Sequence, residues 1–438
     1  MLKSLLTGAA IAAVLAAAPT GVAQPSPSAP AQAAAPAQEA PRCRFTLQGA
    51  QVWTGERFEP RTLHIDGAIF VAAAPAGAIP MPAQWMFLIP PLVDTHTHGL
   101  DEPAGPNDPM HRANLQAGIY YALNPNNIRR ATPGAPFGPD QVEALYAGGG
   151  LTGPGGHPRP LYEMLARMGQ ARGFDMGPLP GRAFHEVSTE AETMAAVERV
   201  QAQGSSVVKL YLLHHDGPDS KGLSAALFRT AVVHAQLRGL RPIVHVETAS
   251  DFRLAAGTRG VVAIVHLPGA FPQLPDDAVY QLNAADAALT ARNGVSISTT
   301  TAVAFNHTSG ERLLRAQRIH AHNLRLLRDA GVNLTAGADR PGATAVDELN
   351  LLRATGLFDG TQLLNIATRN GLKLLFPDRR IGTFEPGSEA SFRIMFADPR
   401  NNWFWLDDAL GGMRGGHVIS DQTGMLRGLC GGGAATAQ

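Results

Sequence analysis

Hydrophobic and polar residues alternate in two different patterns along the chain. Between residue 43 and about residue 80, short apolar runs such as 44–47 and 51–53 are separated by Gly and Pro. This pattern predicts a small β unit. From about residue 89 to residue 377, short β-rich runs alternate with longer stretches of helical periodicity, which predicts repeated βα units and a parallel sheet. A strand-like run returns at 390–396.

The βα alternation is clearest in the middle and later parts of the barrel-like region. Right-handed crossovers of this size wind naturally into a barrel. The expected strands cover 206–212, 242–246, 261–266, 295–298 and 332–337, and the expected helices cover 223–240 and 309–330.

We therefore predict an α/β protein with two parts. Residues 89–381 would form a (β/α)₈ TIM barrel, the closed form into which right-handed βα crossovers wind. Residues 43–88 and 382–430 would form a small β-sandwich domain built from both chain ends, because β material flanks the barrel on both sides.

The composition of residues 1–42 predicts an exported protein with a linker before its folded part. Lys3 precedes an apolar run at 5–18, so residues 1–23 are expected to be a signal peptide. That run is shorter than the roughly 20 residues that cross a bilayer, so no membrane association is expected after cleavage. Residues 24–42 are rich in Ala and Pro and are interpreted as a linker, and residues 431–438 as a disordered tail. The expected location is periplasmic or secreted.

The two cysteines, Cys43 and Cys430, lie near opposite ends of the folded part. An oxidising compartment would allow a disulfide between them if both ends of the fold meet. The other interpretation is two unrelated thiols. The sequence leaves both open.

Composition narrows the class of partner. The chain has 438 residues, 45% of them hydrophobic, and 36 basic residues balance 36 acidic ones. This balance predicts no basic face, so nucleic acid is not an expected partner. A small-molecule substrate is expected, and the sequence leaves open whether the chain forms a homo-oligomer.

Histidines recur at the carboxyl ends of predicted strands, where barrel enzymes place their active groups. His96 and His98 follow an apolar strand, and alternation places them on one face. His245 and His266 end the next two apolar strands of the 205–270 region. A single His in such a position is usually a core residue. Its repetition on consecutive strands indicates metal ligands instead.

Two further residues add charge to this set. Asp339 lies just past the last predicted barrel strand, where an Asp can also act as a helix N-cap. Lys209 lies between apolar residues, where a buried ammonium group is costly. Lys209 must therefore be paired, extended to the surface, or converted by carbon dioxide into an anionic carbamate.

The order His-x-His, Lys, His, His and Asp resembles the amidohydrolase superfamily, especially its two-metal branch of prolidase-like and imidazolonepropionase-like relatives. Supporting motifs are Gly155-Gly156-His157 and the stretch 367–371 followed by Glu385-Pro386-Gly387. The resemblance covers nearly the whole chain after residue 43. It departs at Gly337-Ala338-Asp339, where relatives usually have Gly-Thr-Asp, and at Ala390-Ser391-Phe392, which puts the substrate in doubt.

The resemblance implies a binuclear metal-dependent amidohydrolase. His96, His98 and Asp339 would bind one divalent ion, and His245 and His266 a second. Lys209, as a carboxylated lysine, would bridge them. Zinc is the expected metal, although manganese or cobalt would also suit these ligands. A metal-bridging hydroxide would attack the substrate, and Asp339 would transfer the proton.

Other residues are candidates for contacts with substrate. His157 is a predicted catalytic residue, expected to contact the substrate's oxyanion or carboxylate. The other interpretation is a histidine that lies in a loop without a catalytic role. Tyr211 shares a strand face with Lys209, and Tyr120 follows the second barrel strand. Arg340 and the arginines at 129–130 are candidates for binding a substrate carboxylate, although exposed arginines usually only contact solvent.

The leading functional hypothesis is hydrolysis of a C–N amide bond in a dipeptide, an N-acyl amino acid or a similar small molecule. The first alternative is a lactone, carboxylester or phosphotriester hydrolase with the same two-metal site. A single-metal deaminase ranks lower, because Glu247 is two residues beyond His245 and not three. The second alternative is an exported binding protein that has lost catalysis.

Overall fold

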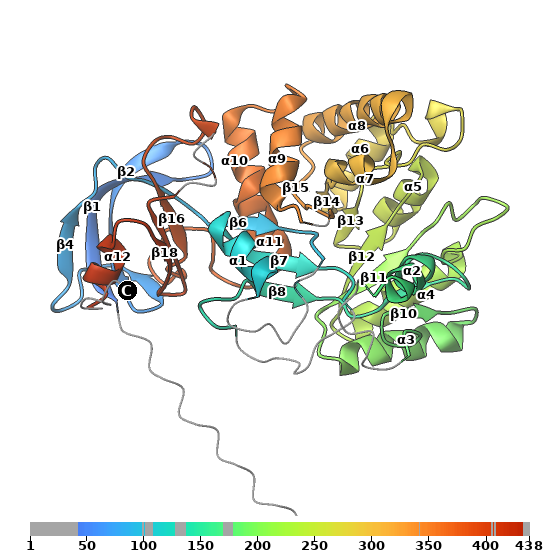
Figure 1. Ribbon diagram of the computed structural model, residues 1–438, viewed down its shortest axis with the longest axis horizontal. Helices are drawn as coiled ribbons and strands as arrows, with labels where there is room; N and C mark the ends of the chain where they lie inside the picture. The colour runs from blue at the N-terminus through green and yellow to red at the C-terminus, as the bar shows by residue number, and fades with distance from the viewer. Residues whose placement is uncertain are drawn as a thin grey trace, which may run out of the picture. The chain divides into compact units, whose positions relative to one another are not determined.

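The computed structural model of the chain describes residues 43–98, 100, 108–127, 137–169, 178–340, 342–403, 406 and 409–431 (Figure 1). The predicted signal peptide, the linker, residues 129–130 and all but the first residue of the predicted tail lie outside these residues. Within the described part, no helix combines the length and apolarity that a membrane crossing requires.

Strands from both ends of the described chain form one sheet, with the order β18-β17-β16-β5-β1-β2-β3 and with β4 beside β1. In Figure 1 the blue and red strands lie side by side, and β16 pairs antiparallel with β5. Hydrogen bonds join all eight strands into a single sheet, whereas we expected a two-sheet sandwich. The strands are β1 (Arg44–Trp53), β2 (Phe58–Asp66), β3 (Ile69–Val71), β4 (Ile79–Pro82), β5 (Phe87–Ile89), β16 (Phe392–Met395), β17 (Gly411–Arg414) and β18 (His417–Asp421).

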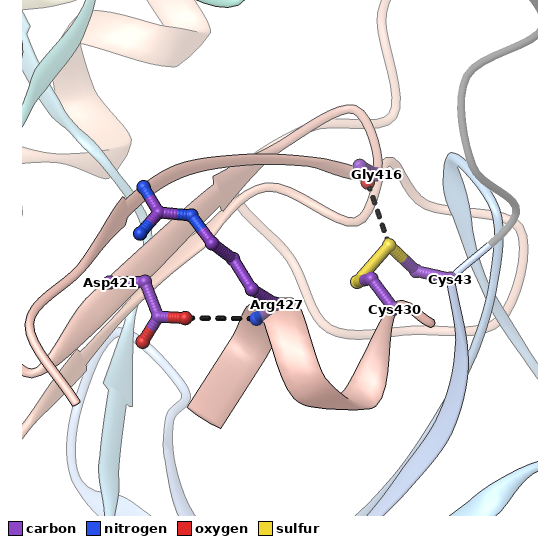
Figure 2. Close-up of a disulfide and its surroundings, with 5 residues drawn as sticks. All are labelled: Cys43, Gly416, Asp421, Arg427 and Cys430. Carbon is purple, nitrogen blue, oxygen red and sulfur yellow. Dashed lines mark hydrogen bonds between the residues drawn. A yellow bond between two sulfur atoms is a disulfide. The ribbon is translucent and has the colours of Figure 1, made fainter. Parts of the chain in front are cut away.

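A disulfide joins the two ends of this sheet region (Figure 2). Cys43 directly precedes β1, and Cys430 directly follows helix α12 (Met425–Leu429). The two Cα atoms are 4.1 Å apart, across a sequence separation of 387 residues. The Cys43 sulfur also lies 3.3 Å from the carbonyl oxygen of Gly416. Of the two interpretations that the sequence left open, the structure has the disulfide.

The central region is a parallel α/β fold of the TIM-barrel type. Its strands form two parallel sheets, with the orders β6-β7-β8 and β10-β9-β11-β12-β13-β14-β15. A backbone hydrogen bond connects one end of each sheet, because Thr95 N, just after β6, donates to Ala336 O, just after β15, at 2.9 Å. The described strands therefore follow the expected parallel order in two sheets instead of in one closed ring. They are β6 (Leu92–Asp94), β7 (Ile119–Asn124), β8 (Glu143–Tyr146), β9 (Gly150–Thr152), β10 (Phe184–Glu186), β11 (Val207–Tyr211), β12 (Arg241–His245), β13 (Ala263–Val265), β14 (Ser296–Ser298) and β15 (Leu334–Thr335).

Helices connect these strands and cover them (Figure 1). The predicted helices 223–240 and 309–330 are present as α4 and α8. Several helices begin with a capping box, as α5 does, where Thr248 and Asp251 satisfy each other's backbone amides. The helices are α1 (Pro109–Gln116), α2 (Arg159–Arg167), α3 (Glu190–Ala202), α4 (Ala225–Leu237), α5 (Ala249–Gly257), α6 (Ala284–Arg292), α7 (Ala304–His307), α8 (Gly310–Asp329), α9 (Ala345–Ala354), α10 (Gly360–Ala367) and α11 (Arg369–Leu375).

Candidate metal centre

Two histidines after β6 meet an aspartate after β15. The Nε2 atoms of His96 and His98 lie 3.3 Å and 3.2 Å from Oδ1 of Asp339. Backbone contact supports the approach, because Asp339 N donates to His96 O at 2.8 Å. His96 is buried, while the His98 side chain is 45% exposed. The residues predicted for the first metal thus lie together, with one histidine facing solvent.

The histidines of β12 and β13 extend this cluster. The ring centroid of His266 lies 4.6 Å from that of His245 and 4.9 Å from that of His96. His266 Nδ1 is also 3.4 Å from Oδ2 of Asp339. One potential ligand atom from each of His96, His266 and Asp339 lies within 4.8 Å of the other two. Four imidazoles and a carboxylate therefore occupy one edge of the parallel strands.

Lys209 lies on β11 and is 1% exposed. Strand pairing places Tyr211 opposite His245, so Lys209, two residues earlier, shares their face. Its Nζ is 5.4 Å from the centroid of the Tyr211 ring. Among the described residues, Lys209 Nζ has no hydrogen bond and no ion pair. Burial lowers the pKa of Lys209 to about 7, and the charge of Asp339 opposes this shift only in part.

Burial also fixes the protonation of the other groups. It lowers the pKa of His96 to about 3, so the imidazole is neutral at physiological pH. Burial pushes the pKa of Asp339 upward, but the neighbouring His96, His98 and His266 outweigh it and hold that pKa well below its ordinary value. His96 Nδ1 and His245 Nε2 are buried without a hydrogen-bond partner in the described part of the chain. Neutral imidazoles beside a carboxylate are a donor set that suits a divalent cation.

The buried carboxylate of Asp94 joins the segment that carries His96 to the segment that carries Asp339. Its Oδ1 accepts hydrogen bonds from His96 N at 3.0 Å and from Ala338 N at 3.2 Å. Gly337 makes the close approach possible, because a Cβ at this position would lie 2.6 Å from the Cβ of His96. The departure from Gly-Thr-Asp at 337–339 thus leaves Asp339 in place.

A second buried carboxylate, that of Glu348, holds the loop whose Thr300 contacts the His266 ring. His266 Nδ1 lies 2.8 Å from the hydroxyl oxygen of Thr300. The Glu348 carboxylate accepts hydrogen bonds from the backbone amides of the two residues that follow Thr300, Thr301 and Ala302, both at 2.8 Å. The Thr299 hydroxyl donates to the same carboxylate at 2.6 Å. Glu348 therefore fixes the loop that orients the His266 ring.

The structure places His157 and Tyr211 in the cluster. The ring centroid of His157 lies 5.4 Å from that of His245 and 5.3 Å from that of Tyr211. Burial, followed by the charges of His245 and Lys209, lowers the pKa of His157 to about 3. His157 is therefore a neutral ring beside the predicted second metal position.

Sequence analysis missed Asn126, which connects three strand ends. Its Oδ1 accepts hydrogen bonds from Gly150 N at 2.8 Å and from the Tyr211 hydroxyl at 3.1 Å. Its carbonyl oxygen lies 3.3 Å from Nδ1 of His98. Asn126 thus orients both His98 and Tyr211. An isolated Asn after a strand has no sequence pattern that marks such a role.

Two predicted substrate contacts do not join the cluster. Tyr120 is fully buried and its hydroxyl lies 3.2 Å from Ser420 Oγ, on β18 of the end sheet. Its side chain therefore packs between the two parts of the fold. Arg340 is exposed to solvent and directly follows Asp339 in the chain.

A cavity of about 540 Å³ opens on His245 and His266. Its walls come from the segment after β12, the long segment after β13, and the beginning of α8. The lining residues are His214, His245, Val246, Glu247, Thr248, His266, Ala270, Phe271, Gln273, Leu274, Tyr280 and Arg312. The cluster is thus accessible to a small molecule.

Solved structures of several hydrolases have the same fold as this chain. An amidohydrolase structure aligns with a TM-score of 0.65 at 18% identity, covering 87% of this chain and 100% of that chain. A Xaa-Pro dipeptidase with methionine bound in its active site gives 0.63 at 16% identity, covering 86% and 99%. Ochratoxinase from A. niger gives 0.65 at 17% identity, covering 87% and 96%. No protein-family model matches the sequence, and no curated protein matches it. The chain therefore has the amidohydrolase fold.

Proposed function

We propose that this chain is a metal-dependent hydrolase of the amidohydrolase superfamily, which cleaves a C–N amide bond in a small substrate. One observation carries the proposal. Lys209 is buried without a charged partner among the described residues, at the same strand edge as four histidines and Asp339. A fold that buried a lysine for stability alone would pair it.

The residues present fit two divalent ions. His96, His98 and Asp339 would hold one ion, and His245 and His266 the other, with Lys209 between them as a carbamate. The lowered pKa of Lys209 supports this role, because only the neutral amine reacts with carbon dioxide. When bound, divalent ions of this kind polarise a carbonyl group and lower the pKa of water. Zinc is the proposed metal, since imidazole and carboxylate ligands suit it.

The chain's own residues supply proton transfer and positioning. Asp339, ionised and beside three imidazoles, would accept a proton and return it to the leaving nitrogen. His157, neutral and next to His245, would donate a hydrogen bond to the substrate's carbonyl oxygen. Tyr211, held by Asn126, restricts the space beside Lys209.

The alternative function is hydrolysis of an ester, lactone or phosphotriester at the same site, because that reaction would use the same metal ligands. An exported binding protein without activity is less consistent with the complete set, because binding alone does not require Asp339 together with Lys209. The proposed location is periplasmic or secreted. The disulfide between Cys43 and Cys430 is consistent with this location, because such bonds persist in oxidising compartments.

Metal analysis and a substrate panel test the proposal. Purified protein should contain close to two divalent ions per chain, and the protein should hydrolyse dipeptides or N-acyl amino acids faster than lactones, esters and phosphotriesters. Chelation should remove the activity, and added zinc should restore it. Less than one ion per chain would contradict the two-metal site, and turnover confined to esters would select the alternative.

A further inference from the structure

The cavity beside His245 and His266 has an outer wall that belongs to a fixed segment, residues 268–280. Arg315 of α8 holds this segment: its guanidinium donates to Leu274 O at 2.7 Å and to Asp277 Oδ1 at 2.6 Å. Farther along α8, Asn323 Nδ2 donates to Tyr280 O at 3.1 Å. The wall is therefore rigid enough to select among substrates.

The wall is mostly apolar on its inner side. Five of its residues line the cavity, and all but Gln273 are apolar or aromatic: Ala270, Phe271, Gln273, Leu274 and Tyr280. The Tyr280 hydroxyl accepts hydrogen bonds from Gln273 N and Leu274 N, both at 3.0 Å, so the polar end of this ring is already engaged. The segment therefore presents mainly hydrocarbon and ring surface to a ligand, which favours an apolar or aromatic substituent.

Arg312 provides the positive charge in this cavity. It lies three residues before Arg315, so both side chains leave α8 on the same side. Arg315 is committed to the wall, whereas Arg312 lines the cavity and has no hydrogen bond or ion pair to any described residue. Glu247, the acidic residue of the lining, lies 3.7 Å from His245 Nε2, at the metal end. A guanidinium without a carboxylate partner is suited to bind a carboxylate from a ligand.

We propose that Arg312 binds the carboxylate of the substrate and that the 268–280 wall accepts an apolar side chain next to it. The preferred substrates would then be amides whose amine half is an apolar or aromatic amino acid with a free carboxylate. This inference rests on the proposed function and makes it narrower. It assigns substrate recognition to Arg312, a residue that the sequence patterns did not single out.

The test compares N-acetyl-L-phenylalanine with N-acetyl-L-phenylalaninol, which has a neutral hydroxymethyl group in place of the carboxylate. With zinc-loaded protein, Arg312→Leu should lower kcat/KM for the acid about 10- to 100-fold, as expected for loss of a charge-assisted hydrogen bond. The value for the alcohol should not change. Arg312→Glu should reverse the preference between the two compounds. Arg318→Leu, an exposed arginine on the same helix outside the cavity lining, is the matched control.

The outcomes separate this inference from the function on which it rests. Equal losses on both compounds, or no loss on either, would overturn the role of Arg312 and leave the hydrolase intact. If the wild-type protein cleaves neither compound, the affinity of the zinc-loaded protein for N-acetyl-L-phenylalanine, measured by calorimetry, tests the role of Arg312 instead. Weaker binding after Arg312→Leu, but not after Arg318→Leu, supports the inference; unchanged binding refutes it.

Discussion

Replacing Lys209 with Met should abolish hydrolysis and at the same time stabilise the metal-free protein. Met is close to Lys in length and is readily accommodated in apolar surroundings. The wild-type side chain is 1% exposed and lacks a charged partner among the described residues. In the metal-free state the amine contributes a burial cost, and its benefit comes only when it acts as a ligand.

The magnitude follows from the pKa of Lys209, which burial lowers from 10.5 to about 7. Each unit of pKa difference corresponds to about 1.4 kcal/mol, so the charged form costs the folded protein about 5 kcal/mol at pH 6. Because the folded protein binds this proton more weakly than the unfolded chain, the cost decreases as pH rises from 7 toward 10.5. At pH 9 about 2 kcal/mol should remain.

Denaturant unfolding in the presence of a chelator, with the disulfide intact, measures this difference. Lys209→Met should raise the free energy of unfolding at pH 6 and should raise it less at pH 9. Lys373→Met, at an exposed position of α11, is the control and should change neither value. A destabilised Lys209→Met protein would show that the amine is paired, and a gain that does not depend on pH would show that burial of its charge is not the cause. Either result would refute the reasoning.

Three other changes test separate parts of the structure. Asp339→Asn should lower kcat about 10²- to 10⁴-fold in zinc-saturated protein, because it removes the proton acceptor; a kcat within the range of the wild type would exclude that role. Glu348→Gln should weaken zinc binding about 10- to 100-fold in a metal titration, because the loop behind His266 loses its anionic acceptor, and saturating zinc should restore activity. Replacing Cys43 and Cys430 with Ser should lower the free energy of unfolding by up to about 5 kcal/mol, since the bond closes a very long loop; an equal stability in reducing and oxidising buffer would contradict it.

Sequence alone could place the predicted ligands on one face of the strands, because strand alternation has a fixed period. His245 is the last residue of β12 and Lys209 lies within β11, so their faces follow from counting residues. The same logic fails for Tyr120. Every residue of β7 is buried, so this strand has no polar face to show which side chains point toward the cluster. Tyr120 in fact faces the end sheet, where its hydroxyl meets Ser420.

Other features depend on contacts between segments that are far apart in sequence. The runs at 44–47 and 51–53 form one strand, β1, with a register shift between Leu47 and Ala50. Gly49 lies in that shift with a φ of 71°, a conformation that few other residues adopt. The pairing of β5 with β16 then makes one continuous sheet of both ends. Periodicity identifies strands, but it does not say which edges pair.

Backbone conformation at the centre supports the functional interpretation independently of the ligand types. Four described non-glycine residues, His214, His266, Thr300 and Asp339, have φ values of 54°, 74°, 43° and 42°, in the left-handed region that non-glycine residues rarely occupy. Each such residue costs about 1–3 kcal/mol and persists only where surrounding contacts hold it. Those contacts are present: the Thr300 hydroxyl at the His266 ring, and the backbone amide of Asp339 on the carbonyl of His96. Two of these four residues are predicted ligands, Thr300 contacts the ring of one of them, and His214 lines the adjoining cavity, so the strain is concentrated around the predicted site. Strain of this kind clusters at functional sites, and its position here therefore favours the functional interpretation.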